Sequence, residues 1–300
     1  MFATMTAGQF QLLTEPDLSN IWHDSFPEIE EQFSAIFNIR DMERLKITDA
    51  KMAGFGPLQV QAEGGSVIYD EAIAPVTRDY ESVVRALGYK ISDKLIRGEL
   101  YGEVNLLERD LLRSSKDDME QFAFGLLNSA TGVGVSTGFD GLALASTAHT
   151  RLDGGATQAN RPTTLAALSL AELHTAVITF RNWRNDRGRP FRSIPQSLVI
   201  PPDLELDAVE LLESAMRPDT ANNATNAITR FGLVPKVVDY LTTATYWSIV
   251  GDSHDINFLW WFRPETGSEV DFDTDTIKRK VRQSYARGHG EWRGYYQGNS

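Results

Sequence analysis

The chain has 300 residues, of which 42% are hydrophobic and 23% are charged, so it can bury a core and is not a disordered polymer. Its net charge of −12 argues against a protein whose main task is to grip nucleic acid, because such proteins usually carry a basic surplus. The absence of cysteine excludes disulfides and thiol chemistry. The sequence shows neither a secretory signal peptide nor an uninterrupted apolar span, so we expect no membrane contact.

The N-terminal region predicts an arm followed by a short helix. Residues 1–24 are weakly patterned, and we expect them to be ordered only where another surface holds them. Ser25 and Glu28 have the spacing of a capping box, and apolar residues follow at helical intervals, so a helix is predicted over 25–37. Its preferred partner is the core of its own chain, with a neighbouring subunit as the alternative.

Residues 46–75 predict an extended hairpin. Leu58 and Val60 alternate with glutamines, Glu63-Gly64-Gly65 forms the turn, and Ser66–Tyr69 begins the return. Because an isolated two-stranded hairpin is marginal in water, we expect it to rest on another surface, such as a second copy of the chain. A further strand is predicted over 78–91.

The longest predicted element is a helix over 92–130, with Ser92 as its N-cap. Gly98 and Gly102 weaken its first turns, so we expect a kink there and regard both as hinge candidates. Its expected apolar stripe consists of Ile96, Leu100, Val104, Leu107, Leu111, Met119, Phe122 and Leu126. Its expected charged face, toward solvent or neighbours, consists of Glu103, Arg109, Asp110, Arg113, Lys116, Asp117 and Glu120.

Helices and strands mix in the rest of the chain without a strict βαβ alternation, which predicts an α+β fold. The predicted elements are a helix capped by Ser169 that runs to Phe180, a strand over 197–200, a helix over 204–215, strands over 235–241 and 246–250, and a strand over 277–285. The last strand is two-faced: Lys278, Lys280 and Arg282 alternate with residues of the opposite face. Asp271, Asp273 and Asp275 form an acidic patch just before it.

A search for reactive groups finds no convincing constellation. Gly134–Gly138 match the G-x-S-x-G pattern around a nucleophilic Ser136, but a predicted helix stands where the motif needs a strand, so a flexible connection is the preferred interpretation. His254 lies between two aspartates, and the patch of Asp271, Asp273 and Asp275 lacks the glycine and glutamate of a calcium loop. We therefore predict no catalytic residue, no cofactor and no metal.

Taken in order, several segments resemble the major capsid proteins of tailed bacteriophages, in particular the Mu-like major head subunit group with the Hong Kong 97-type fold. Their order and spacing over residues 60–296 carry the resemblance, rather than any one motif. The segments are Glu63–Glu71, Gly88–Ser92, Leu100–Gly102, Asp140-Gly141, Ser146–His149, Asn160–Pro162, Asp186–Gly188, Leu198–Pro202, Arg217-Pro218 with Asn222, Asn226 and Ala227, Phe272–Thr274, and Glu291–Tyr295.

The resemblance implies an α+β fold in four parts. These are an N-terminal arm with a short helix (1–45), an extended hairpin loop (46–75), a peripheral domain on a long spine helix (76–150 and 256–300), and an axial domain (151–255). It implies hexamers and pentamers in an icosahedral shell that encloses double-stranded DNA without sequence-specific binding. It also implies a location in the virion after assembly in the host cytoplasm. The implied partners are a portal protein and a separate scaffolding protein, and the presence of a decoration protein stays open.

Under this interpretation we expect subunit contacts at both charged and exposed segments. The interface candidates are Glu63, Gly64, Tyr69, Asp271, Asp273, Lys278, Lys280 and Arg282. Some relatives join subunits through Lys–Asn bonds, but here the hairpin has Lys51 and no lysine at its tip, so we predict no crosslinking. Two alternatives stay open: an encapsulin-like compartment of the same fold, and a serine hydrolase that uses Ser136.

Overall fold

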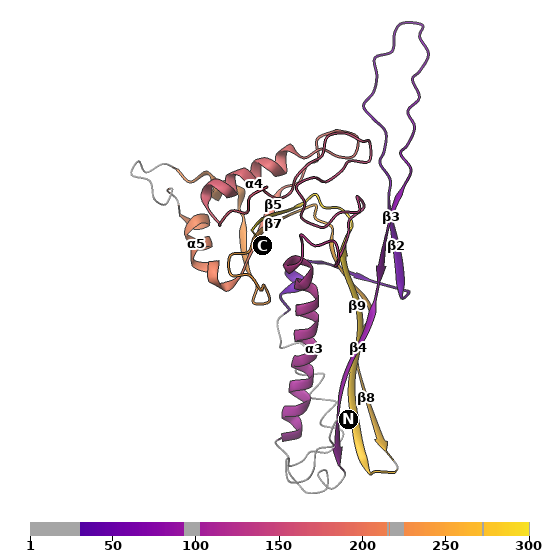
Figure 1. Cartoon of the computed structure of the whole chain (residues 1–300), viewed down its shortest axis with the longest axis vertical. Helices are drawn as coiled ribbons and strands as arrows, with labels where there is room; N and C mark the ends of the chain where they lie inside the picture. Colours follow the sequence, from indigo (N-terminus) through magenta and orange to yellow (C-terminus); the bar gives the residue numbers. More distant parts are fainter. Residues whose placement is uncertain (1–30, 93–102, 215, 217–224, 272, 300) are drawn as a thin grey trace.

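The computed structural model describes residues 31–92, 103–214, 216, 225–271 and 273–299. The molecule is elongated (Figure 1): one long helix lies along long strands at one end, a smaller α+β unit lies at the other, and a loop projects beyond it. None of the helices in these ranges combines the length and apolar character that a membrane span requires.

The first sheet is built from the long strands. Its order is β1 (Asn38–Asp41), β8 (Ile256–Asp271), β9 (Thr276–His289) and β4 (Val83–Ser92). β1 is parallel to β8, and the other neighbours are antiparallel. In β9, Val281, Gln283 and Tyr285 are buried while Lys280 and Arg282 are exposed, which confirms the predicted two-faced strand. β8, a strand of 16 residues, was not predicted.

The long helix α3 (Glu103–Asn128) has 26 residues and is therefore about 39 Å long. The prediction that Ser92 caps it is wrong: Ser92 is the last residue of β4 and pairs with Thr276 of β9. Pairing along the whole of β4 outweighs the local capping preference of a serine. Gly98 and Gly102, the hinge candidates, lie outside the described residues.

The charged face predicted for α3 is only partly solvated. Lys116 and Glu120 are 3% and 4% exposed, and Glu108, also on this helix, is 1% exposed. The helix packs on a face of β9 that is itself partly polar, so polar side chains bridge the two elements: Ser115 donates to Gln283 Oε1 at 2.9 Å. Helical periodicity predicts the buried Leu111, Met119 and Leu126 but not these polar contacts between α3 and β9. Ile96 and Leu100 of the predicted stripe lie outside the described residues.

A second sheet has the order β10 (Tyr295–Asn299), β7 (Trp247–Gly251), β5 (Pro195–Ile200) and β6 (Val234–Val237). Around it lie α4 (Leu170–Asn182), α5 (Glu205–Glu213) and the short helices η2 (Pro202–Leu204) and η3 (Ala227–Phe231). Ser169 caps α4 as predicted, because its Oγ accepts from the Glu172 amide at 3.3 Å. β10 comes from the end of the chain, so residues 295–299 join the sheet of the expected axial domain.

At the N-terminal side, the part of the predicted helix 25–37 that the structure describes is a single 3-10 turn, η1 (Phe33–Ala35), followed by β1. Ser25 and Glu28 lie outside the described residues. Phe33, Ile36 and Phe37 are buried against Phe124 and Phe258 in the core of their own chain, which was the preferred expectation.

The projecting segment is a loop on a short two-stranded sheet. β2 (Lys46–Lys51) and β3 (Val76–Glu81) pair at its base, and the Gly65 amide donates to the Ala62 carbonyl at the predicted turn, where Gly64 has a φ of 73°. Residues 52–75 between them form no strand ladder within the described chain, contrary to the predicted alternation. The strand predicted over 78–91 is divided at Ser82 between two sheets, β3 and β4.

Candidate functional site

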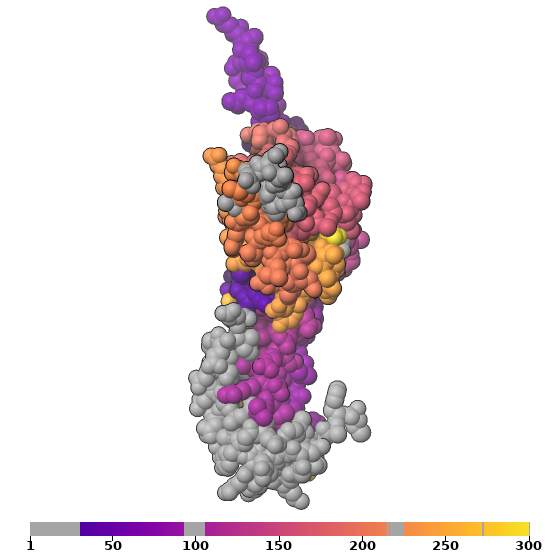
Figure 2. All heavy atoms as spheres, turned by 90° about the vertical axis from the view of Figure 1, so that its left-hand side faces the viewer, coloured from indigo at the N-terminus to yellow at the C-terminus, as the bar shows by residue number. Residues whose placement is uncertain are grey.

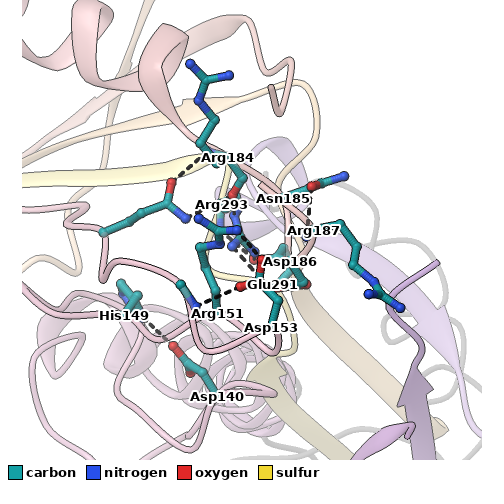
Figure 3. Close-up of polar contacts among 12 residues, drawn as sticks. Asp140, His149, Arg151, Asp153, Arg184, Asn185, Asp186, Arg187, Glu291 and Arg293 are labelled. Carbon is teal, nitrogen blue, oxygen red and sulfur yellow. Dashed lines mark hydrogen bonds and ion pairs between the residues drawn. The ribbon is translucent and has the colours of Figure 1, made fainter. Parts of the chain in front are cut away.

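Four charged side chains meet where the loop 52–75 leaves the body. We call Lys51, Asp186, Glu291 and Arg293 the root cluster. Lys51 Nζ lies 2.6 Å from Asp186 Oδ2 and also contacts Glu291. Arg293 lies 2.8 Å from Glu291 and 3.3 Å from Asp186, so each acid is shared by both bases. Figure 3 shows Asp186, Glu291 and Arg293 pointing toward one another.

The root cluster joins three distant parts of the sequence. Lys51 ends β2, Asp186 lies in the turn after α4, and Glu291 and Arg293 lie between β9 and β10. The side chain of Arg293 is only 1% exposed. Burial opposes the charged form of Asp186, but its contacts with Lys51 and Arg293 outweigh this and lower its pKa. Loss of one base would leave both acids with a single base between them, and breaking a buried ion pair in this way costs about 3–5 kcal/mol.

A tight turn beside the cluster holds the loop by its backbone. We call residues 185–189 the clamp turn. Arg187 Nε donates to the Gly54 carbonyl at 2.6 Å, and its Nη2 donates to the Glu71 carbonyl. Arg189 donates to the Phe55 carbonyl. The turn therefore grips both the outgoing and the returning chain of the loop.

A buried histidine network lies next to the root cluster. His149 Nδ1 is 2.6 Å from Asp140 Oδ2, and Nε2 is 3.1 Å from Asn160 Oδ1. The amide of Asn160 donates to the Leu144 carbonyl at 2.7 Å, which leaves Oδ1 to face the histidine. Both ring nitrogens thus face side-chain oxygens, and the ring stacks on Trp292 with 4.3 Å between the ring centroids. The pKa of Asp140 is lowered, since its contact with His149 outweighs the effect of burial.

Five of the segments that carried the family resemblance contribute residues to these two networks. The residues that these segments supply to the two networks are Asp140, His149, Asn160, Asp186, Glu291, Trp292 and Arg293. None was predicted as a functional residue. Their polar types in short matching segments were the signal available, but nothing in the sequence indicated which of them would meet.

Ser136 of the G-x-S-x-G pattern is 6% exposed and is a packing residue in this structure. Its Oγ lies 2.9 Å from His289 Nδ1 and accepts from Arg78 Nη2 at 3.0 Å and from the His289 amide at 3.2 Å. Burial lowers the pKa of His289 to about 3, so the ring is neutral. Turns, not a strand and a helix, flank the serine, so the elbow geometry is missing.

The predicted interface residues fall into two separate sets. Glu63, Gly64 and Tyr69 lie in the projecting loop, and Tyr69 is 90% exposed. The acidic and basic residues lie on β8, β9 and their connection, at the opposite end of the molecule (Figure 1). Three of these residues are paired within their own chain: Asp271 contacts Lys278, and Arg282 lies 2.8 Å from Glu265. Asp273 and Lys280 are exposed.

The candidate cation sites do not assemble. Within the part of the chain that the structure describes, no group of three or more acidic or histidine side chains could hold a metal ion. His254 instead accepts from the Ile256 amide at 3.4 Å, and burial lowers the pKa of its ring. Both sets of residues are parts of turns and of the sheet surface.

The long sheet with one helix along it, the compact second unit and the projecting loop define a fold shared with solved phage structures. The chain is similar to one from Mycobacterium phage Patience, with a TM-score of 0.58 and 10% identity, covering 99% of this chain and 92% of that one. It is similar to a chain of the bacteriophage JBD30 capsid, with a TM-score of 0.56 and 15% identity over 71% and 92%. It is also similar to a chain from Mycobacterium phage Adephagia, with a TM-score of 0.55 and 11% identity, covering 90% of this chain and 90% of that one. At these identities the likeness shows the fold alone.

The family is shown by sequence. The model of the phage capsid protein family matches residues 75–298, and the chain belongs to this family. A search of curated proteins finds no match. The predicted resemblance to phage capsid proteins and the α+β fold of the Hong Kong 97 type are confirmed: the chain is a phage capsid protein. The match is to capsid proteins of phages, which favours this function over the encapsulin-like alternative.

Proposed function

We propose that this chain builds its shell from hexamers and pentamers, and that the loop 52–75 of one subunit lies on a neighbouring subunit. The supporting observation is the exposure of apolar side chains on that loop: Leu58 is 101% exposed, Val60 95% and Tyr69 90%. Figure 2 shows the loop as a narrow projection clear of the body. Contiguous exposed apolar groups mark interaction sites, and burial of each such side chain stabilises a contact by about 1.5–3 kcal/mol.

A second contact is proposed at the far end of the sheet, through Asp271, Asp273, Lys278, Lys280 and Arg282. The Arg282–Glu265 pair has side chains more than half exposed. Exposed ion pairs contribute about 0–1 kcal/mol, so these partners can exchange for those of a neighbour at little cost. Contacts at opposite ends of an elongated subunit suit a closed lattice, since each subunit then reaches two neighbours along its long axis.

The remaining parts of the proposal concern the particle. The proposed division of the chain is an arm (1–45), a loop (46–75), a peripheral part (76–150 and 256–300) and an axial part (151–255). Within the last range of the peripheral part, β10 packs in the axial sheet. The net charge of −12 suits a container that encloses double-stranded DNA without clamping it. We propose assembly in the host cytoplasm with a portal protein and a separate scaffolding protein, and no enzymatic role or cofactor for the chain; a decoration protein stays an open alternative.

Assembly of the purified chain tests the loop contact directly. The variant Val60→Asp places a charge on the proposed apolar contact, and Gln59→Asp adds the same charge at a neighbouring polar position. We expect the parent and Gln59→Asp to form rings or closed particles in negative-stain electron microscopy, and Val60→Asp to stay unassembled in size-exclusion chromatography. Normal particles from Val60→Asp would refute the contact.

A further inference from the structure

The direction of the loop 52–75 is set at its root. Beyond the root, its hydrogen bonds stay within the loop: the Gly56 amide donates to Asp70 Oδ2 at 2.6 Å, and Gln61 Nε2 donates to the Gly65 carbonyl at 2.7 Å. The contacts that tie it to the body are those of the clamp turn and of Lys51 in the root cluster. Among the described residues, these polar contacts join the loop to the body, beside the β2–β3 pairing at its base and the buried side chain of Ala53.

Arg187 is suited to this task by the shape of its guanidinium. Its Nε and Nη2 reach carbonyls on the two sides of the loop, at Gly54 and Glu71, and its Nη1 lies 3.5 Å from Asp70. A planar guanidinium that donates hydrogen bonds to both sides of the loop fixes the separation of the two sides and the direction of the loop together. Arg189 adds a bond to the Phe55 carbonyl on the outgoing side.

The clamp turn is itself held in one conformation. Asn185 Oδ1 accepts from the amides of Arg187 and Arg189 at 3.0 and 2.9 Å. Gly188 has a φ of 73°, and a Cβ there would lie 2.7 Å from a guanidinium nitrogen of Arg151. Its neighbour Asp186 is held by Lys51 and Arg293. Arg187 and Arg189 thus project from a rigid support.

Small changes at this support are amplified at the tip. About nine extended residues separate the root from the turn, a rise of roughly 30 Å. A rotation of about 10° at the root would therefore move the tip by about 5 Å, more than the roughly 4.0–4.5 Å within which apolar atoms make contact. If the tip of the loop is to contact a neighbouring subunit at a defined place, the orientation of the loop at its root must be fixed.

We propose that Arg187 and Arg189 are positioning residues for shell assembly: their bonds to the main-chain carbonyls of Gly54, Phe55 and Glu71 fix the direction in which the loop meets a neighbouring subunit. This inference rests on the proposed loop contact. The direction of the loop, however, is a property of the single subunit and is measurable without assembly.

The chain has no cysteine, so introduced cysteines can carry spin labels. Ser66→Cys near the loop tip and Ala171→Cys on α4, both at exposed positions, give a distance between loop and body by double electron–electron resonance in the unassembled subunit. We expect one narrow distance distribution in the parent and its loss in Arg187→Ala/Arg189→Ala. Arg187→Lys should also broaden it, because an ammonium keeps the charge but not the fork.

Two controls separate positioning from folding. Arg192→Ala removes an exposed arginine just beyond the clamp turn and should leave the distribution narrow. A second label pair, Ala171→Cys with Glu210→Cys on α5, should keep its distance in every variant if the body stays folded. An unchanged loop distribution in Arg187→Ala/Arg189→Ala would overturn the proposal, whatever the fate of the loop contact itself.

Assembly is the second readout. We expect Arg187→Ala/Arg189→Ala to lose closed particles to misassembled sheets or free subunits, and Arg192→Ala to assemble like the parent. If the loop distribution broadens but particles form at the parental rate and size, positioning is not needed for assembly and the proposal is wrong. Failure of the proposed function would appear differently, as normal particles from Val60→Asp.

Discussion

Glu120 of α3 makes the stability of this subunit depend on pH. Its two carboxylate oxygens accept from the backbone amides of Gln32 and Phe33, at 2.7 and 3.0 Å. Burial raises the pKa of Glu120 from 4.5 to about 7; the two amide bonds and Lys116 act against this, and Glu31 adds to it. The carboxyl group of Glu120 therefore joins the segment before β1 to α3. Burying this group costs more free energy when it is charged than when it is protonated.

The direction of this pH dependence follows from the linkage between proton binding and folding. Because the folded-state pKa lies above the ordinary value, the folded chain holds this proton more tightly than the unfolded chain does. The stabilisation is fully present below about pH 4.5 and is lost as the pH rises through about 7. The difference between the two values corresponds to about 3 kcal/mol, which solvent screening reduces to about 2 kcal/mol.

Glu120→Gln removes this titration, and urea unfolding of the unassembled subunit measures the effect by tryptophan fluorescence. We expect the parent to lose about 2 kcal/mol more than the variant in the free energy of unfolding between pH 5 and pH 8. Glu210→Gln, an exposed change on α5, should keep the parental pH dependence. The reasoning is refuted if Glu120→Gln and the parent lose the same free energy over this range.

The remaining predictions concern the root cluster, the hairpin and the hinge candidates. Arg293→Ala leaves Asp186 and Glu291 with Lys51 as their shared base, and we expect a loss of about 3–5 kcal/mol, against less than about 0.5 kcal/mol for Arg192→Ala, in the same unfolding assay. A cost for Arg293→Ala no larger than for Arg192→Ala would contradict the cluster's role. Boiled particles should run as monomers on a denaturing gel, since Lys51 is held in ion pairs at the root of the loop; a ladder of bands would disprove this. In the family that the sequence resembles, the shell matures by a conformational change. The hinge candidates Gly98 and Gly102 predict that Gly98→Ala/Gly102→Ala impairs this change, as measured by cryo-electron microscopy, and a parental change would reject the prediction.

Several elements of the fold could be predicted from local pattern. Ser169 caps α4 because the bond it makes reaches only three residues along the chain. The alternation of β9 separates Val281 and Tyr285 from Lys280 and Arg282 because a strand turns successive side chains to opposite faces. The turn at Gly64 needs a positive φ, which glycine adopts without strain. The α+β class follows from the same short-range rules.

What these rules missed depends on partners far along the chain. Ser92 is a strand residue because Thr276 pairs with it, and Glu120 is buried because residues 32 and 33 place two amides over it. The root cluster needs residues 51, 186, 291 and 293 to meet, and no periodicity encodes such a meeting. Local sequence determined the cap of α4, the turn at Gly64 and the alternation of β9. The tertiary structure decided which charges are buried and how the loop is held, because ion pairs and strand pairing form between segments that only the completed fold brings together.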